Sequence, residues 1–175
     1  TKIETPLGTV IASSDGQSLT GLWFEGQKYE CSFVEDPVLD DSLPLWKNVK
    51  HALEEYFQGV GDVAPAVPIA FVGGTAFQKA VWDVLTEIPY QTVWTYKDVA
   101  ERIGEKLGRK TSSRSVGTAI GRNPISLFVP CHRVVATTGA LTGYAGGVER
   151  KRALLTLEGH SVVKDRVMKG ERHEA

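Results

Sequence analysis

One cysteine of the sequence stands in a setting that could do chemistry. Cys131 is preceded by Pro130 and followed by His132, Arg133 and Val134. The thiolate is the nucleophilic form of cysteine, and neighbouring positive charge lowers the pKa of the thiol. The alternative is a small, inert core residue, which is the usual role of a buried cysteine. The pentapeptide alone therefore leaves a reactive and a structural Cys131 both open.

The cysteine content favours free thiols. Cys31 and Cys131 are the two cysteines among 175 residues, and they lie far apart in the chain. A disulfide-stabilised domain would be richer in cysteine, and no Cys or His pair has zinc-finger spacing. We therefore expect a reducing, cytoplasmic location and no structural metal, with Cys31 a partly buried thiol that has no assigned role. No apolar run is long enough to span a membrane.

Helices that could position Cys131 are predicted on both sides of it. Thr75 and Gln78 form a capping box that begins one helix. Residues 95–104 and 112–123 predict two short helices around a glycine-containing connection, with Gly104 ending the first. Such a pair is typical of a helix-turn-helix, although paired helices that merely pack together are also common. Residues 148–160 predict a last amphipathic helix.

The rest of the chain predicts an α+β fold with two domains. Residues 1–26 predict a small antiparallel sheet, because turn residues interrupt β-branched runs. Residues 41–59 predict a helix capped by Asp41 or Ser42, and a Pro/Gly-rich linker follows. We expect an N-terminal domain over 1–74, a mainly helical, winged-helix-like domain over 75–163 and a disordered tail over 164–175. Short strands, 126–130 and 133–137, are predicted to flank Cys131.

Charge is distributed unevenly between the two halves. Residues 1–74 hold 4 Lys+Arg against 11 Asp+Glu, whereas residues 75–160 hold 12 against 7. A basic second half suggests that it binds a polyanion such as DNA. Chance variation of surface charge is the alternative, and the charge count alone does not separate the two.

Four motifs in order together resemble a known family. They are "IPYQTVWTYKDVA", "SSRSVGTAIGRNP", "VPCHRVV" and "GALTGYAGG". In this order and spacing they are similar to the methylated-DNA–protein-cysteine methyltransferases, also called guanine-O6 alkyltransferases. The resemblance runs from about Thr75 to His160, and the first half of the chain fits the family only loosely.

The resemblance implies an activity and three catalytic residues. Cys131 would take an alkyl group from guanine O6, or from thymine O4, irreversibly and once per protein molecule. His132 would act as general base through a bridging water, and Glu158 would orient His132. Without the resemblance, Glu158 would be interpreted as a surface residue. No cofactor is implied.

The resemblance also implies how damaged DNA is bound. The partner would be alkylated double-stranded DNA, approached by a monomer through the minor groove, with the damaged base flipped out. Arg114 would fill the gap in the base stack, and Tyr96 would help to rotate the nucleotide. The further DNA-binding residues implied are Ser113, Ser115, Thr118, Asn123 and Arg133. Asn123 would also be a hinge that ties the second helix to the cysteine turn, and Arg133 would hold structure or charge near the site. The protein would be nucleoid-associated when it is bound to DNA.

The base pocket is implied to involve the glycine-rich segment after Cys131. Its residues would be Val134, Tyr144, Ala145 and Gly146. Ala145 departs from members that carry a serine there, so a hydroxyl that could bond guanine O6 is missing and the breadth of substrates is open. Three alternatives remain: a lesion-binding relative without transfer activity, an alkylation-sensing transcription factor and a cysteine hydrolase.

Overall fold

The computed structural model describes residues 1–63 and 66–168, and in it the chain divides into two compact units. The first unit comprises Thr1–Gly74 and Pro124–Phe128, and the second comprises Thr75–Asn123 with Val129–Ala175. The two main segments meet between Gly74 and Thr75. The sequence analysis placed residues 124–128 in the second domain, whereas the structure assigns them to the first unit.

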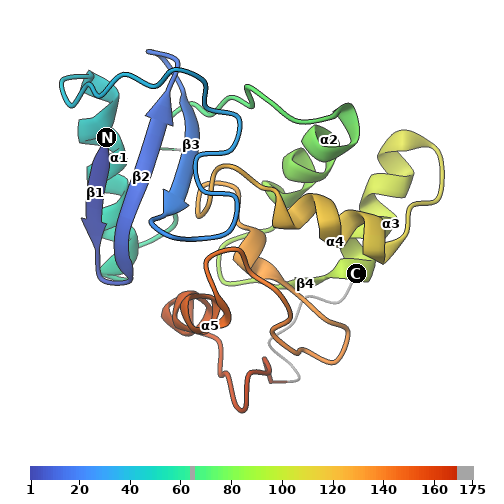
Figure 1. Ribbon diagram of the computed structural model, residues 1–175. Helices are drawn as coiled ribbons and strands as arrows, with labels where there is room; N and C mark the ends of the chain where they lie inside the picture. The colour runs from blue at the N-terminus through green and yellow to red at the C-terminus, as the bar shows by residue number, and fades with distance from the viewer. Residues whose placement is uncertain (64–65, 169–175) are drawn as a thin grey trace. The chain divides into compact units, whose positions relative to one another are not determined.

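The first unit is built on an antiparallel sheet. Strands β1 (Lys2–Thr5), β2 (Gly8–Ser14) and β3 (Leu19–Phe24) follow one another in that order. The turn between β2 and β3 forms because the Asp15 carboxylate accepts hydrogen bonds from the backbone amides of Gln17 and Ser18. Helix α1 (Pro44–Phe57) packs against this sheet (Figure 1). The small sheet and helix predicted for the first half are therefore confirmed.

Strand β3 is the centre of the first unit. All six of its residues are buried, and its outer edge forms parallel bridges through Leu19 to Ile69 and through Leu22 to Ile125. These bridges explain why Pro124–Phe128 belongs to the first unit. A residue run that looks like a strand beside Cys131 therefore serves to complete a distant sheet edge.

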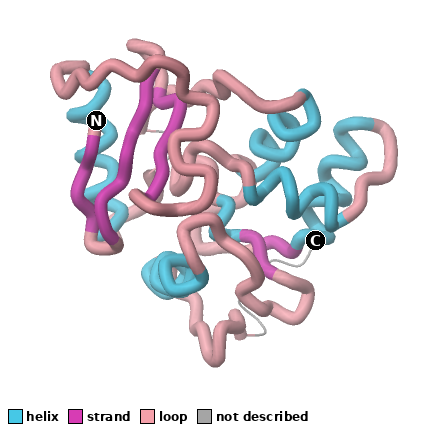
Figure 2. The backbone as a smooth tube through the Cα atoms, in the orientation of Figure 1, coloured by secondary structure: helices cyan, strands magenta, loops and turns pink. Residues whose placement is uncertain are grey.

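The second unit is mainly helical (Figure 2). Its helices are α2 (Ala76–Leu85), α3 (Tyr96–Leu107), α4 (Ser113–Gly121) and α5 (Val148–Leu157). The predicted capping box of Thr75 and Gln78 begins α2, and a second box of Thr95 and Asp98 begins α3. Helices α2, α3 and α4 pack against one another. Strand β4 (Trp94–Thr95) pairs in parallel with β5 (Val134–Val135).

Several local predictions were wrong. Helix α3 continues through Gly104 and ends at Gly108, whose left-handed backbone (φ 68°) favours a glycine. Helix α1 has no side-chain cap, because Leu43 occupies the cap position and Pro44 begins the helix. Cys131 is flanked by one strand rather than two, since residues 126–128 form turns and residues 129–130 are not in a strand.

The predicted disordered tail begins too early. Val162 and Val167 form an antiparallel bridge, and Val167 is buried against Val93, Val135 and Leu155. The burial of this valine orders residues 164–168, and the remainder of the predicted tail, 169–175, lies outside the described residues. None of the helices in the described ranges is both long and apolar enough to cross a membrane.

Candidate active site

Cys131 lies on a tight turn whose backbone is fixed by hydrogen bonds within the second unit. Residues Cys131–Arg133 form a 3-10 turn after Pro130, and β5 follows directly. The Cys131 amide donates to the Val129 carbonyl at 2.8 Å. The side-chain amide of Asn123 donates to the same carbonyl at 2.9 Å. Cys131 is 7% exposed. The cysteine is therefore almost completely covered, and the two hydrogen bonds to Val129 fix the backbone on which it lies.

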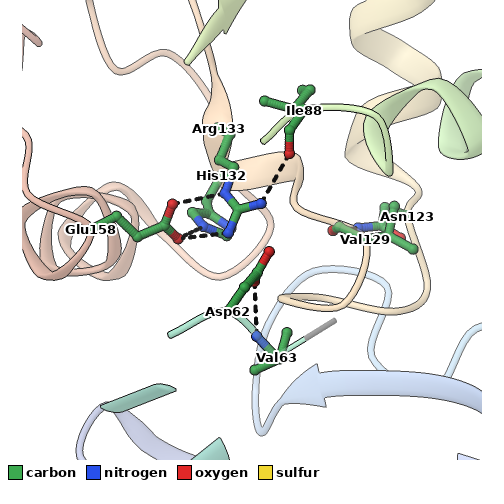
Figure 3. A network of polar contacts seen from close by, with 8 residues as sticks. All are labelled: Asp62, Val63, Ile88, Asn123, Val129, His132, Arg133 and Glu158. Carbon is green, nitrogen blue, oxygen red and sulfur yellow. Dashed lines mark hydrogen bonds and ion pairs between the residues drawn. The ribbon is translucent and has the colours of Figure 1, made fainter. Parts of the chain in front are cut away.

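The two residues after Cys131 converge on one carboxylate (Figure 3). His132 Nε2 lies 2.5 Å from one oxygen of Glu158, and Arg133 Nε donates to the other oxygen at 2.7 Å. Arg133 also donates to the carbonyl of Ile88 at 3.1 Å. Helix α5 delivers Glu158 at its last turn. The side chains of His132, Arg133 and Glu158 form a buried polar cluster that directly follows the cysteine turn.

The geometry of His132 leaves one ring nitrogen for chemistry. Nε2 is engaged by Glu158, whereas Nδ1 is buried and has no hydrogen-bond partner among residues 1–63 and 66–168. A carboxylate on Nε2 favours the tautomer with the proton there, which leaves Nδ1 as a proton acceptor. The sequence of nucleophile, base and orienting carboxylate is that of a catalytic triad.

Burial and charge act in opposite directions on the ionisable groups. Burial raises the pKa of Cys131, while a hydrogen bond from Asn123 and the charge of Lys151 oppose that rise. Burial would also raise the pKa of Glu158, but the charges and hydrogen bonds of His132 and Arg133 outweigh it and hold that pKa well below its usual range. Glu158 is therefore a carboxylate at neutral pH.

Lys151 is a member of this site that the sequence analysis missed. Its side chain is fully buried, and its ammonium donates to the Val134 carbonyl at 2.6 Å. The helical spacing could have predicted that Lys151 is buried. One face of the last helix follows the i, i+3, i+4, i+7 pattern of a buried stripe, and its members are Lys151, Leu154, Leu155 and Glu158. We had assigned that face by its leucines alone.

Helix α4 presents the predicted small residues to solvent. Ser113, Arg114, Ser115 and Thr118 are all exposed. Ser112 caps the helix by accepting from the Ser115 amide at 3.0 Å. The exposed face therefore offers one long cation among short hydroxyl side chains.

Tyr96 connects this helix to the glycine-rich segment. Its hydroxyl donates to the Thr142 carbonyl at 2.8 Å. A Cβ built on Gly117 would lie 3.7 Å from the Tyr96 ring, so this glycine of α4 packs beside the tyrosine. Tyr96 thus stands between the predicted DNA-contacting helix and the loop that follows Cys131.

Two predicted DNA-binding residues lie inside the protein instead. Arg133 is 2% exposed, and its guanidinium is occupied by Glu158 and Ile88. Asn123 is buried with its amide on Val129. Both side chains support the cysteine turn, in keeping with the hinge and structural roles implied for them, and contact of either with DNA stays a prediction.

The predicted pocket residues differ in exposure. Val134 and Gly146 are buried, whereas Tyr144 and Ala145 are half-buried. Gly147 adopts a positive φ of 93° at the start of α5, a conformation that favours glycine. The half-buried pair is the part of the predicted pocket that a substrate could contact directly.

The fold and the site together define an α+β protein with a buried cysteine that is followed by a buried His–Glu pair. Two family models cover most of the chain. The first, described as "6-O-methylguanine DNA methyltransferase, DNA binding domain", matches residues 76–160. The second, described as "6-O-methylguanine DNA methyltransferase, ribonuclease-like domain", matches residues 1–71.

Individual proteins agree with these models. A methylated-DNA–protein-cysteine methyltransferase of Haemophilus influenzae is 40% identical over 156 residues, which span 88% of this chain and 82% of that protein. A Methanosarcina acetivorans protein of the same name is 38% identical over 89% of this chain and 95% of its own. The crystal structure of Mycobacterium tuberculosis OGT in complex with DNA superposes with a TM-score of 0.74, at 37% identity over 90% of both chains. The chain belongs to the methylated-DNA–protein-cysteine methyltransferase family.

Proposed function

We propose that this protein repairs DNA by transferring an alkyl group from guanine O6, and from thymine O4, to its own Cys131. The observation that carries the proposal is the buried His132–Glu158 pair directly after Cys131, with Nδ1 of His132 left as an acceptor. Family membership supports the reaction class. Transfer to a protein side chain is stoichiometric, because a thioether is not readily cleaved again.

The proposed reaction is a displacement at the alkyl carbon. His132 takes the thiol proton through a bridging water, and the carbon–sulfur bond forms as the carbon–O6 bond breaks. The electron pair of the broken bond leaves with guanine, which takes up one proton. Tyr96 would donate a hydrogen bond to the departing base as negative charge develops on it, once its single O–H has left the Thr142 carbonyl. The proton lost by Cys131 balances the proton gained by guanine.

DNA is proposed to meet the second unit at α4. The surface of Ser113, Arg114, Ser115 and Thr118 is exposed, and small side chains allow a helix to lie close to the narrow minor groove. Helices α3 and α4 would act as a helix-turn-helix, with Arg114 replacing the flipped nucleotide in the base stack. The solved relative bound to DNA supports this class of partner.

The substrate range is proposed to depend on Tyr144 and Ala145. Both are half-buried, and Ala145 cannot donate a hydrogen bond to O6, since it has no hydroxyl. We expect Ala145→Ser to change the relative rates on methylated and benzylated guanine. The protein is proposed to act as a monomer, in the cytoplasm and on the nucleoid.

The test is mass spectrometry after incubation with duplex DNA that contains O6-methylguanine. We expect one methyl group per protein molecule, located on Cys131, and restored guanine in the DNA. An undamaged duplex of the same sequence is the control and should give no adduct. Repeated turnover by one protein molecule, or a methyl group on another residue, would refute the proposal.

A further inference from the structure

A buried lysine contacts β5, the strand that directly follows the cysteine turn, and the reaction above gives it no part. Lys151, in the first half of α5, has no solvent exposure. Its ammonium donates to three backbone carbonyls, those of Val134 at 2.6 Å and of Thr142 and Gly143 at 3.4 Å each. The Tyr96 ring centroid lies 6.0 Å from the nitrogen. These contacts are carbonyl dipoles and an aromatic face, and none of them carries a full negative charge.

The buried charges do not balance while Cys131 is a thiol. Glu158 is the one buried carboxylate in the described part of the chain, and Arg133 contacts both of its oxygens. Lys151 therefore adds a positive charge that Glu158 does not offset. A buried cation without a counter-charge is strongly unfavourable. Ionisation of Cys131 would supply the missing negative charge.

We propose, resting on the alkyl-transfer function above, that Lys151 is a positioning residue whose buried ammonium is the counter-charge of the Cys131 thiolate. The two groups act on each other electrostatically. Burial lowers the pKa of Lys151 to about 8, and the charge of Cys131 opposes that fall. In turn, Lys151 opposes the rise that burial causes in the pKa of Cys131. Each group thus favours the charged form of the other.

Among the described residues, few ionisable groups surround the Lys151 ammonium, so its effect on the Cys131 thiol can be tested separately. Cys131 is the ionisable group whose charge acts on the pKa of Lys151, and the Tyr96 ring of α3 lies 6.0 Å from the ammonium. The β5 strand and the glycine-rich segment contribute the carbonyls of Val134, Thr142 and Gly143. His132 is directed at Glu158 instead. A change at Lys151 should therefore act on the Cys131 thiol with little contribution from other ionisable groups.

Alkylation removes the counter-charge that Lys151 depends on. The thioether product is neutral, so the ammonium is left without a buried anion. Its bonds to Thr142 and Gly143 hold the glycine-rich segment, and Thr142 also accepts the Tyr96 hydroxyl. Loss of the charge pair therefore weakens the anchoring of the loop that borders the proposed base pocket.

The first experiment compares Lys151→Met with the unaltered protein in a Cys31→Ser background, so that Cys131 is the single thiol. The readout is the rate of iodoacetamide modification as a function of pH. We expect the apparent thiol pKa to rise by about one unit or more, which slows modification about ten-fold at neutral pH. The two rates should converge at high pH, where both thiols are ionised.

Lys97→Met is the matched control, because Lys97 is exposed in the same unit and its loss changes the net charge equally. Solvent screens exposed charges, so its profile should coincide with that of the unaltered protein. A Lys151→Met profile that coincides with it too, or that is slower at all pH values without a shift, would overturn the proposal. Such results would make Lys151 a packing residue.

A second measurement needs no substitution at Lys151 and covers the case in which that variant does not fold. The Lys151 side-chain resonance is titrated in the protein before and after methylation of Cys131 with methyl iodide. We expect the pKa of Lys151 to fall on methylation, and an unchanged pKa would overturn the proposal. Neither reagent depends on DNA, so a missing adduct from methylated duplex would refute the proposed function without deciding the role of Lys151.

Discussion

At the scale of single residues, the site is a set of buried charges arranged around one sulfur. Cys131, His132 and Arg133 are consecutive, yet their side chains have different roles. The histidine and the arginine share the Glu158 carboxylate, while the cysteine remains for chemistry. The consequence is that one carboxylate controls both the base and the local structure.

The nucleophile is tested by Cys131→Ser. We expect alkyl transfer to be abolished, because an alcohol is far less ionised than a thiol at neutral pH, while DNA binding is largely kept. The measurement is the methyl adduct by mass spectrometry, together with a binding isotherm on duplex DNA. Cys31→Ser is the control and should transfer normally. An adduct that persists in the Cys131 variant would show that another residue is the acceptor.

The orienting carboxylate is tested by Glu158→Gln. Removing the charge takes from buried Arg133 the carboxylate that it contacts, and breaking a buried ion pair typically costs about 3–5 kcal/mol of folding free energy. His132 also becomes a weaker base, which raises the apparent pKa of the Cys131 thiol, so the pH profile of transfer should move to higher pH. Chemical denaturation and single-turnover rates give the two quantities. Glu149→Gln, on the exposed side of α5, is the control and should change neither.

The same carboxylate gives the stability a pH dependence of known sign. The pKa of Glu158 is lowered in the folded protein from an ordinary value of 4.5. Its contribution to stability is therefore complete above pH 4.5 and is lost as the pH falls toward the folded pKa. The glutamine variant should lack this component of the acid-induced loss of stability. A parallel loss in both proteins would mean that Glu158 contributes nothing to it.

At the scale of the elements, the N-terminal caps of two helices position the side chains that are proposed to contact DNA. Thr95 caps α3 directly before Tyr96, and Ser112 caps α4 just before Ser113 and Arg114. Fixing the first turn of each helix therefore fixes the residues proposed to meet the DNA. Helix α5 acts at its other end, because Glu158 follows its last residue.

The function of α4 is tested by Arg114→Ala. Arg114 is proposed to support base extrusion, which costs a few kcal/mol in a duplex and nothing for a free base. The variant should therefore slow repair of duplex DNA much more than reaction with free O6-benzylguanine. Arg166→Ala, an exposed arginine elsewhere in the second unit, should affect neither rate. Equal losses on the two substrates would make Arg114 a structural residue.

The cap of α3 is tested by Thr95→Ala. The Thr95 hydroxyl accepts the Asp98 amide at 3.0 Å, and the Asp98 carboxylate accepts the Thr95 amide at 2.9 Å. Loss of an N-cap typically costs about 1 kcal/mol. We expect this loss in chemical denaturation, with a smaller change for Thr156→Ala on the exposed side of α5. An unchanged stability would mean that the cap is not needed to hold Tyr96.

At the scale of the whole molecule, charge divides the two main segments of the chain. The acidic residues dominate 1–74 and the basic residues dominate 75–160. Affinity for undamaged duplex should therefore fall steeply as salt rises, because lysines and arginines release counterions from phosphates. It should also vary little with sequence, since minor-groove readout is degenerate. Strong discrimination among undamaged sequences in a fluorescence titration would favour a regulator instead.

The sequence by itself determined the chemistry and the local starts of structure. The Pro130–Val134 motif pointed to Cys131, and Thr75 with Gln78 predicted a capping box that the structure contains. The sheet of the first half was also predictable, because strands and turns are encoded by neighbouring residues. Together with the cysteine motif, the three other motifs of the second half indicated the family. The resemblance to that family then implied the role of Glu158.

Only the tertiary structure decided which side chains surround the sulfur. Glu158 lies 26 positions after His132, and the docking of α5 brings the two within 2.5 Å. The same docking buries Lys151, which its charge alone would have assigned to the surface. Arg133 and Asn123 are buried for a related reason. Arg133 donates to the buried Glu158 carboxylate, and Asn123 donates to the Val129 carbonyl. Burial and pairing depend on segments distant in the sequence, and local patterns do not encode them.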